Sequence, residues 1–475
     1  MKKQKFLLVL LFVVACFFVT ACNTTQSYVD YDGTEVQGIT EDKIYVGNTA
    51  ATSGAFSTVG IPFNIGLNAV FAKYNAAGGY NGKQVELIHY DDEFTAEKGL
   101  TYTKKLVEED QVFALVGHFG TPTVGATVDY IASESGIPMV YAATGISDLY
   151  NTEAKGYERA VMSVQPIYNA EGRVLLARAV SAAEGAYGLE GKKIGVISTT
   201  DEAGMGMLDG IEYQAKALGV EVKYVKTSAA SGTNHATAVN TLKAAECDVI
   251  IIAANQAPFQ EIMNYMRDGG LDNVKVITSY VSANATDLTK LRDGGAITET
   301  REVYTAAWLD IASNAILYAP EASNVYGSYL WAGYKVLAEI LGVPGLYDYG
   351  VPGYSQDYWT AAETIYAYAL TVDVNNAFAY SYNSYCLAGY IAGVLFIEGL
   401  NRVQASGAEL TWLNYINAME SAPIDIPMGG EINYANGARL GITDLALNKY
   451  DMASGNLVTY SGITSLDDII AHIAK

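Results

Sequence analysis

Short apolar segments and longer helix-like segments alternate through the first two thirds of this chain. Runs such as Val249–Ala253 have the length of a buried strand, and stretches such as Glu202–Leu218 have the length of a helix. This rhythm predicts parallel sheets covered by helices on both faces. The predicted strands are 43–48, 85–91, 112–117, 138–142, 193–198, 220–225, 249–253 and 274–279, and the predicted helices are 62–77, 96–109, 121–134, 202–218, 233–245 and 259–269.

The rhythm occurs twice, so we expect two α/β lobes joined by short crossings. Ligands of such sheets lie beyond the carboxyl ends of the strands, which places a site in the cleft between the lobes. Further along, Tyr385–Gly399 predicts a helix and Leu445–Asp451 predicts a final strand. The Tyr-rich segment 310–382 is more typical of half-buried surface than of a stacking platform.

The first residues have a different pattern. A basic start precedes the apolar run Phe6–Phe18, and Val19–Cys22 closes it with small residues before a cysteine. This order predicts an export signal that is too short to span a membrane. The closing residues resemble a bacterial lipoprotein box, in which Cys22 takes a lipid; the alternative is an ordinary signal cut near Ala21. We interpret 1–21 as a signal peptide and 22–42 as a tether, and expect an extracytoplasmic, lipid-anchored protein.

Charge and composition narrow the class. The chain has 29 basic and 51 acidic residues, and loss of Lys2, Lys3 and Lys5 with the signal would change its formal charge from −22 to −25. Such a surface repels phosphate backbones, so we exclude nucleic acid as a partner. With 50% hydrophobic residues the chain is globular. Cys247 and Cys386 are expected to be buried thiols.

One strand-to-helix junction has a physical mechanism for binding. Thr121 suits a helix N-cap and Pro122 the first helical position. Free backbone N–H groups and the helix dipole there would favour a carboxylate, although plain capping without a ligand explains the same residues. Loops at Ser53-Gly54 and Ala142–Gly145 repeat the pattern, and their convergence on one rim would favour a site.

Signs of catalysis are weak. The sequence contains no nucleophile elbow and no phosphate-binding Gly-rich loop with lysine. Asp91-Asp92-Glu93 reads as a solvated strand-end loop rather than a metal or acid/base cluster. No Cys or His spacing is typical of a metal site. We therefore predict a protein that is not an enzyme and needs no cofactor.

Several short motifs in this order resemble the solute-binding proteins of branched-chain amino-acid ABC transporters. They are Ser53-Gly54, Asn75–Gly82, Tyr90–Asp92, Gly117-His118, Gly136–Pro138, Ala143-Thr144 and Met266–Leu271. The resemblance implies the type I periplasmic-binding fold with three hinge crossings. It places 43–163 and about 303–428 in lobe 1, and 164–302 and about 429–475 in lobe 2.

The resemblance also implies a site, with departures from the family pattern. Thr121 matches a hydroxyl position, and Ala143 and Thr144 match loop positions, that hold the ligand's carboxylate. Val59 and Ala203 stand where amino-acid binders have tyrosines, and Tyr280 stands where an acid pairs with the ammonium. Either Asp201 or Glu202 replaces that acid, or the ligand is not an α-amino acid. The expected ligand-binding residues are Ser53, Phe56, Val59, His118, Phe119, Thr121, Ala143, Thr144, Asp201, Ala203, Asn255 and Tyr280.

The sequence thus predicts a receptor, expected to be monomeric, that delivers a small carboxylate-bearing solute to an ABC permease by lobe closure. A sensory binding protein of the same fold, feeding a membrane receptor, is an alternative. An exported hydrolase is a third reading, and it would need a nucleophile and base in the cleft.

Overall fold

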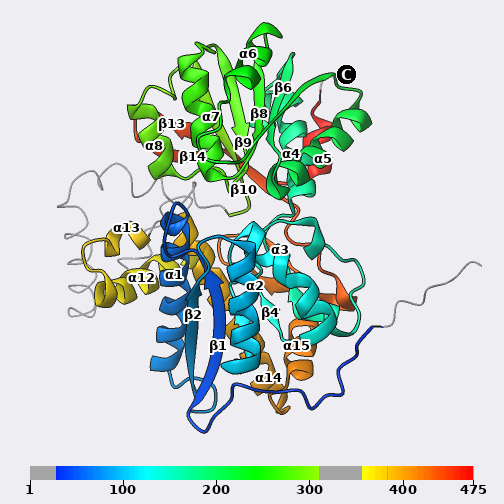
Figure 1. Cartoon of the computed structure of the whole chain (residues 1–475), viewed down its shortest axis with the longest axis vertical. Helices are drawn as coiled ribbons and strands as arrows, with labels where there is room; N and C mark the ends of the chain where they lie inside the picture. Colours follow the sequence, from blue (N-terminus) through cyan, green and yellow to red (C-terminus); the bar gives the residue numbers. More distant parts are fainter. Residues whose placement is uncertain (1–27, 310–355, 382, 474–475) are drawn as a thin grey trace, which may run out of the picture.

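The chain forms two lobes, one above the other in Figure 1, each built on its own β-sheet. The structure is a computed structural model, and it describes residues 28–309, 356–381 and 383–473. The predicted signal peptide, Cys22 and most of the Tyr-rich segment lie outside these residues.

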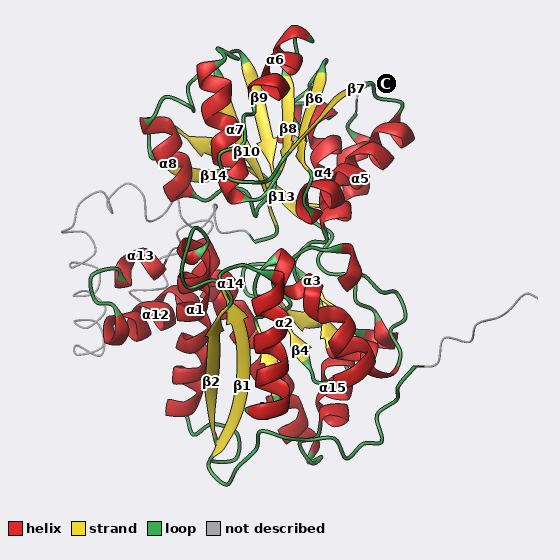
Figure 2. Cartoon of the chain, viewed as in Figure 1, coloured by secondary structure: helices red, strands yellow, loops and turns green. Residues whose placement is uncertain are grey.

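Lobe 1 contains a five-stranded parallel sheet in the order β2-β1-β3-β4-β5. Its central strands are completely buried, as expected of parallel strands covered on both faces. Helix α1 packs along α14, and α2 packs on α3, so helices enclose this sheet (Figure 2). The strands are β1 (Lys43–Ala50), β2 (Gln84–Asp91), β3 (Ala114–Val116), β4 (Met139–Val140) and β5 (Val161–Met162); the helices are α1 (Ser57–Ala76), α2 (Ala96–Lys104), α3 (Thr121–Tyr130), α12 (Gln356–Val372), α13 (Ala377–Ser381), α14 (Ser384–Ser406) and α15 (Trp412–Glu420).

Lobe 2 contains a seven-stranded sheet in the order β14-β13-β10-β9-β8-β6-β7. It is parallel from β10 to β7, whereas β13 and β14 add antiparallel strands at one edge. The strands are β6 (Ile194–Thr199), β7 (Val222–Thr227), β8 (Val249–Ala253), β9 (Val274–Thr278), β10 (Arg301–Ala307), β13 (Leu445–Asp451) and β14 (Asn456–Thr464); the helices are α4 (Tyr168–Val180), α5 (Glu202–Leu218), α6 (Ala236–Ala244), α7 (Gln256–Asp268), α8 (Ala285–Asp293) and α16 (Leu466–Ala471).

Two predicted lobe boundaries differ from the strand pairing. Residues from about 303 were assigned to lobe 1, but Val303 pairs with Val276 inside the second sheet, because β10 continues the parallel order beyond β9. Residues from about 429 were assigned to lobe 2. The short strand β12 (Glu431–Ile432) instead pairs with β11 (Ile424–Asp425), directly after α15 of lobe 1. The return to lobe 2 therefore comes later, just before β13.

The chain passes between the sheets after β5, after β10 and before β13, as the predicted fold requires. The first and third crossings run side by side. Ile442 donates its backbone N–H to the Val164 carbonyl at 3.0 Å, and the Tyr434 hydroxyl donates to the Ser163 carbonyl at 3.0 Å. Motion at one of these crossings therefore has to involve the other.

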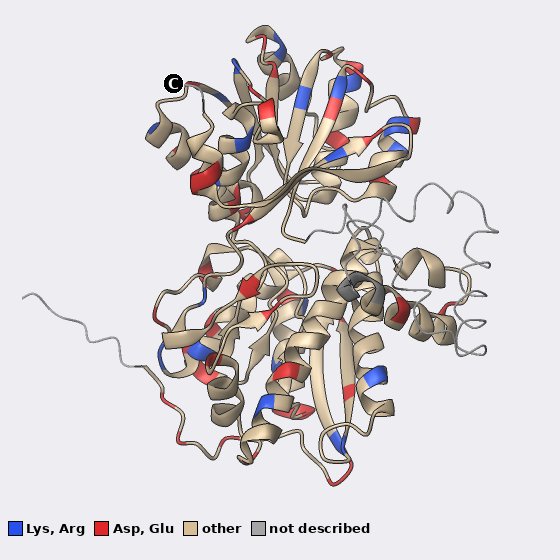
Figure 3. Cartoon of the chain, turned by 180° about the vertical axis from the view of Figure 1, so that it is seen from behind, with Lys and Arg blue, Asp and Glu red and all other residues tan. Residues whose placement is uncertain are grey.

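Helix α14 is the one described helix that is long and apolar enough to span a membrane, but 78% of its apolar window is buried inside the protein. It packs against α1 and α15, which explains its apolar composition as that of a core helix. Cys386 within it and Cys247 are buried free thiols, as predicted. Charged side chains are spread over both lobes (Figure 3).

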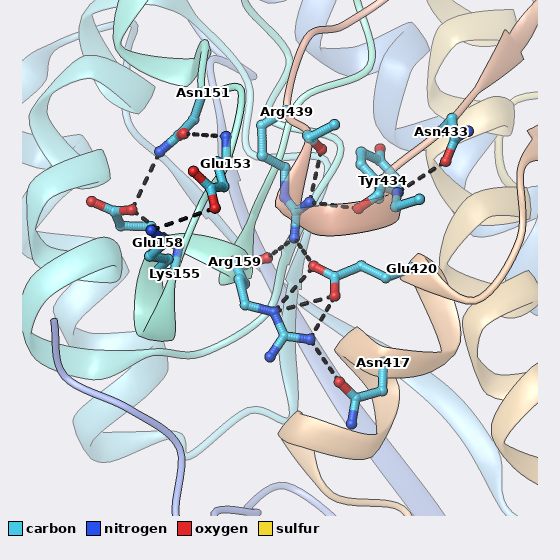
Figure 4. A network of polar contacts seen from close by, with 12 residues as sticks. Asn151, Glu153, Lys155, Glu158, Arg159, Asn417, Glu420, Asn433, Tyr434 and Arg439 are labelled. Atoms are coloured by element: carbon cyan, nitrogen blue, oxygen red, sulfur yellow. Dashed lines mark hydrogen bonds and ion pairs between the residues drawn. The ribbon is translucent and has the colours of Figure 1, made fainter.

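A buried ion-pair network lies beside the third crossing, and we call Arg159, Glu420 and Arg439 the hinge network (Figure 4). Arg439 is 1% exposed and donates to Glu420 at 2.7 Å and to the Arg159 carbonyl at 2.5 Å. Arg159 donates to the other carboxylate oxygen of Glu420 at 2.5 Å and to Asn417 at 2.6 Å. These bonds tie the segment before the crossing to α15 of lobe 1.

Candidate functional site

A cavity of about 720 Å³ lies between the lobes, where the carboxyl ends of strands from both sheets meet. Lobe 1 lines it with the start of α1 and with the loops after β3 and β4, and lobe 2 lines it with the loops after β8, β9 and β10. Of the predicted ligand-binding residues, those on its wall are Phe56, Val59, Phe119, Thr121, Ala143, Asn255 and Tyr280.

The three predicted loops of lobe 1 do meet at this wall. Phe119 pairs with Ala143 in an isolated bridge, and Gly120 donates its N–H to the Ala143 carbonyl at 3.3 Å. The aromatic ring of Phe56 stacks on Phe94 at 3.7 Å between centroids, and Phe94 lies 6.3 Å from Phe119. Loops distant in sequence therefore form one continuous rim.

Two helix starts on this rim differ from the predictions. Helix α1 begins at Ser57 and contains Pro62, which was expected to open it; as the sixth helical residue, Pro62 removes one backbone hydrogen bond from the second turn. The N-cap of α3 is Gly120, with φ of 112°, and not Thr121. A side chain at Gly120 would contact Phe94 at 2.9 Å, so the position favours glycine for its space as well as its conformation.

Because Thr121 does not cap α3, its hydroxyl is available for another role. It lies 3.0 Å from the Thr144 hydroxyl and 3.0 Å from the Tyr168 hydroxyl. Thr144 also donates to Tyr168 at 3.4 Å. We call these three residues the hydroxyl cluster. Tyr168 starts α4 of lobe 2, so the cluster joins the two lobes beside the cavity.

The lobe 2 wall is positioned by a buried carboxyl group. Glu171 is fully buried and accepts hydrogen bonds from the Ser279 hydroxyl at 2.8 Å and the Tyr280 N–H at 3.1 Å. Burial raises the pKa of Glu171 to about 7, although both bonds favour its charged form. The Tyr280 ring lies 6.4 Å from Trp308, edge to face. Glu171 therefore fixes the loop that brings Tyr280 to the cavity.

Several predicted site residues lie away from the wall. His118 is completely buried, and its Nε2 lies 2.7 Å from the Thr103 hydroxyl, because its side chain points into lobe 1. Burial lowers the pKa of His118 to about 3, so this ring is neutral. Ala203 is a buried residue in the first turn of α5, Ser53 is exposed, and the Thr144 hydroxyl is buried beside that of Thr121.

Neither Asp201 nor Glu202 replaces the missing acid on the wall. Asp201 caps α5 through the Gly204 N–H and accepts from the Thr199 hydroxyl, so its carboxylate is occupied within lobe 2. Glu202 faces Gly125 of α3, where an added Cβ would lie 3.2 Å from its carboxylate. Among the described residues that line the cavity there is no Asp, Glu, Lys, Arg or His.

The acidic loop after β2 is also more buried than predicted. Asp92 is 0% exposed and accepts from the Phe94 N–H at 2.8 Å and the Thr123 hydroxyl at 3.0 Å. Burial raises the pKa of its carboxyl group. The described part of the chain contains no cluster of His, Cys, Asp or Glu that could hold a metal ion. Asp92 thus holds the rim together by joining β2 to α3.

Some wall residues were not predicted. Trp308 and Gln165 each follow the end of a strand at a crossing, and Tyr168 opens α4. Trp308 directly follows β10 and Gln165 lies three residues after β5, so an aromatic or amide residue close to a strand end is the signal that could have found them. On one side, α13 adds Phe378 and Tyr380 to the wall, so part of the Tyr-rich segment does line the cavity.

Comparison with known proteins gives the family. Residues 43–315 match the family model described as periplasmic binding protein, so this chain belongs to that family. It is a family of binding proteins rather than enzymes. An "Amino acid binding protein" from Pseudomonas aeruginosa is 23% identical over 237 residues, which cover 48% of this chain and 58% of that protein. The chain thus matches little more than half the length of this relative.

Solved structures share the fold over nearly the whole chain. A fatty acid ABC transporter substrate-binding protein from Thermomonospora curvata has a TM-score of 0.68 at 16% identity, covering 94% of this chain and 99% of that one. An ABC transporter solute binding protein from Rhodopseudomonas palustris, in complex with 3,4-dihydroxy benzoic acid, has a TM-score of 0.64 at 17% identity, covering 90% and 98%. These matches confirm the predicted two-lobed α/β fold.

Proposed function

We propose that this protein is an extracytoplasmic receptor that binds a small carboxylate-bearing solute between its lobes and presents it to an ABC permease. The observation that carries the proposal is the cavity of about 720 Å³ whose wall comes from both lobes. A ligand that contacts both walls binds the closed arrangement more tightly than an open one, so it shifts the population toward closure. The similar proteins named as ABC transporter components support this role.

The carboxylate would lie against the lobe 1 rim. Thr121 is 5% exposed on the cavity wall, and its backbone N–H begins α3, where the helix dipole favours an anion. Thr144 and Tyr168 would share the hydroxyl contact with Thr121. Neutral hydrogen-bond donors can hold a carboxylate without a basic side chain, provided that several of them converge on it.

Isothermal titration calorimetry against organic acids, amides and amino acids tests the binding role. We expect at least one carboxylate-bearing solute to bind with a dissociation constant below a millimolar. Small-angle X-ray scattering with and without that solute measures closure directly, since closure reduces the radius of gyration. Failure of every solute in a broad panel to bind contradicts the proposal.

We further propose that the mature protein is a monomer anchored to the membrane through a lipid on Cys22. Replacing Cys22 by Ser prevents lipidation and is expected to release the protein from the membrane fraction into the soluble exported fraction. If the Cys22→Ser chain stays in the membrane fraction as before, the anchor lies elsewhere. Uptake of the bound solute, measured in cells with and without the protein, separates transport from sensing.

A further inference from the structure

Several carboxyl groups lie directly behind the described wall, and each is already hydrogen-bonded inside the protein. Asp287 accepts from the wall residues Gln256 and Asn284, and Asp373 accepts from the wall residues Asn376 and Tyr380. The Asp201 carboxylate accepts from Thr199 and from the N–H at the start of α5. The Glu171 carboxyl group is fully buried behind Tyr280, with Ser279 as its second donor. Since the described wall itself carries no Asp, Glu, Lys, Arg or His, no counter-charge from the described residues faces the cavity.

An ammonium group would be destabilised in such a cavity. It would lose its hydration without gaining a carboxylate partner, and an unpaired buried charge is strongly unfavourable. Amide oxygens such as those of Gln165 and Asn255 can accept hydrogen bonds, but they bring no full negative charge. The wall therefore discriminates against α-amino acids, whose ammonium is always present at neutral pH.

The aromatic part of the wall favours apolar groups of a ligand. Phe56 and Phe94 stack face to face on the lobe 1 side, and Trp308 and Tyr280 meet edge to face on the lobe 2 side. A flat ring or an alkyl chain can lie between these two aromatic pairs and bury its surface against both lobes.

From the neutral wall and the two aromatic pairs, we infer that the solute has an aromatic or aliphatic body and carries no ammonium group. This inference rests on the proposed function, because it describes the ligand of the same cavity. It adds a prediction about the ammonium, whereas the proposed function concerns the carboxylate.

Pairs of compounds that differ only in the ammonium test the inference. The full-length Cys22→Ser chain is titrated with 3-phenylpropanoate and phenylalanine, and with 4-methylpentanoate and leucine. We expect each acid to bind at least ten-fold more tightly than its amino acid. Equal or tighter binding of either amino acid overturns the inference and leaves the proposed function standing.

A neutral compound separates the two proposals. If 3-phenylpropanamide binds and 3-phenylpropanoate does not, the carboxylate of the proposed function is wrong and the inference stands. If none of these compounds binds while another amino acid in the broad panel does, the inference is wrong and the proposed function stands. Failure of all carboxylates and amides contradicts both.

A variant that supplies the missing counter-charge is a second test. Val281 lies on the lobe 2 wall next to Tyr280 and is half-buried. Val281→Asp is expected to shift the ratio of phenylalanine to 3-phenylpropanoate affinity at least ten-fold toward phenylalanine. The control Val281→Asn introduces a side chain of the same shape as Asp but without its charge. It should leave the ratio of the two affinities within two-fold of that of the unmodified chain. An unchanged ratio in a folded Val281→Asp chain, judged by its thermal melt, counts against the neutral wall.

Discussion

Two buried polar regions of this protein treat charge in opposite ways. In the hinge network, Arg439 is 1% exposed and shares Glu420 with Arg159, so two positive charges are held by one carboxylate inside the protein. In the cavity between the lobes, the polar groups of the described wall are hydroxyls and amides without full charge. Both regions lie beside the crossings. The polar groups of the hinge network bind one another, whereas those of the cavity wall are left to bind a ligand.

The difference follows from where the partners of each region come from, because the hinge network has them inside the protein and the cavity receives them with a ligand. The hinge network finds its partners within the protein, since both arginines face the Glu420 carboxylate and nearby carbonyl oxygens, although Nε of Arg439 has no hydrogen-bond partner. The cavity has to be stable when empty as well as when a ligand is bound. A neutral wall avoids leaving an unpaired charge in the empty state, and it also selects what can enter.

The largest expected effect comes from breaking the hinge network at its most buried member. Arg439→Ala leaves Glu420 with one partner fewer and several carbonyl groups without a donor, so we expect a loss of about 3–5 kcal/mol in the free energy of unfolding. Urea denaturation measures it. Arg159→Ala is the matched control, because Arg159 has a side chain 22% exposed and should cost clearly less. Equal losses in both variants would contradict the distinction.

The next effect concerns Glu171, the buried acid behind the neutral wall. Its pKa in the folded protein is about 7, above the ordinary value of 4.5. Between these two pKa values the folded state keeps a proton that the unfolded chain loses. The contribution of Glu171 to the free energy of unfolding is therefore complete below pH 4.5 and is lost as the pH rises through 7. The change is on the order of 3 kcal/mol. Glu171→Gln should remove that part of the slope, measured by urea denaturation between pH 4.5 and 8.

If the free energy of unfolding depends on pH in the same way in both chains, Glu171 does not cause the expected loss of stability. The comparison uses the difference between the variant and the unmodified chain, so the titration of other groups cancels.

Removing an aromatic side chain from the lobe 2 wall tests the cavity itself. Tyr280→Ala deletes a ring that contacts Trp308 and lines the cavity, and we expect a bound acid to lose about 2 kcal/mol of affinity. Tyr280→Phe keeps the ring and loses only the hydroxyl, which donates to the Pro166 carbonyl at 3.4 Å. Calorimetry should therefore find affinity nearly preserved in Tyr280→Phe. Unchanged affinity in Tyr280→Ala would place the ligand elsewhere.

The smallest effect is a single hydroxyl group in the neutral wall. Thr121→Ala should weaken a carboxylate ligand by about 1–2 kcal/mol through one lost hydrogen bond. Thr121→Ser retains the hydroxyl and should bind nearly as well as the unmodified chain in the same titration. If the two variants bind equally, the carboxylate does not contact this hydroxyl.

Much of the fold was predictable because its signals are local. The strands at 249–253 and 445–451 and the helix at 202–218 are found where the sequence predicted them. Buried parallel strands are apolar throughout, and the helices between them have strong starts and ends. The rim of lobe 1 was predictable for the same reason, since Phe119, Thr121 and Ala143 follow strands whose carboxyl ends share an edge.

The sequence alone determined the alternation of strands and helices, the two-lobed arrangement and the loops that would border a cleft, because periodicity and chain punctuation act over a few residues. Tertiary structure decided which side chains from those loops face the cavity. His118 turned into lobe 1, Asp201 became a helix cap, and Trp308 joined the wall from a strand assigned to the other lobe. Orientation and pairing of this kind depend on contacts between segments far apart in the chain, which no local pattern encodes.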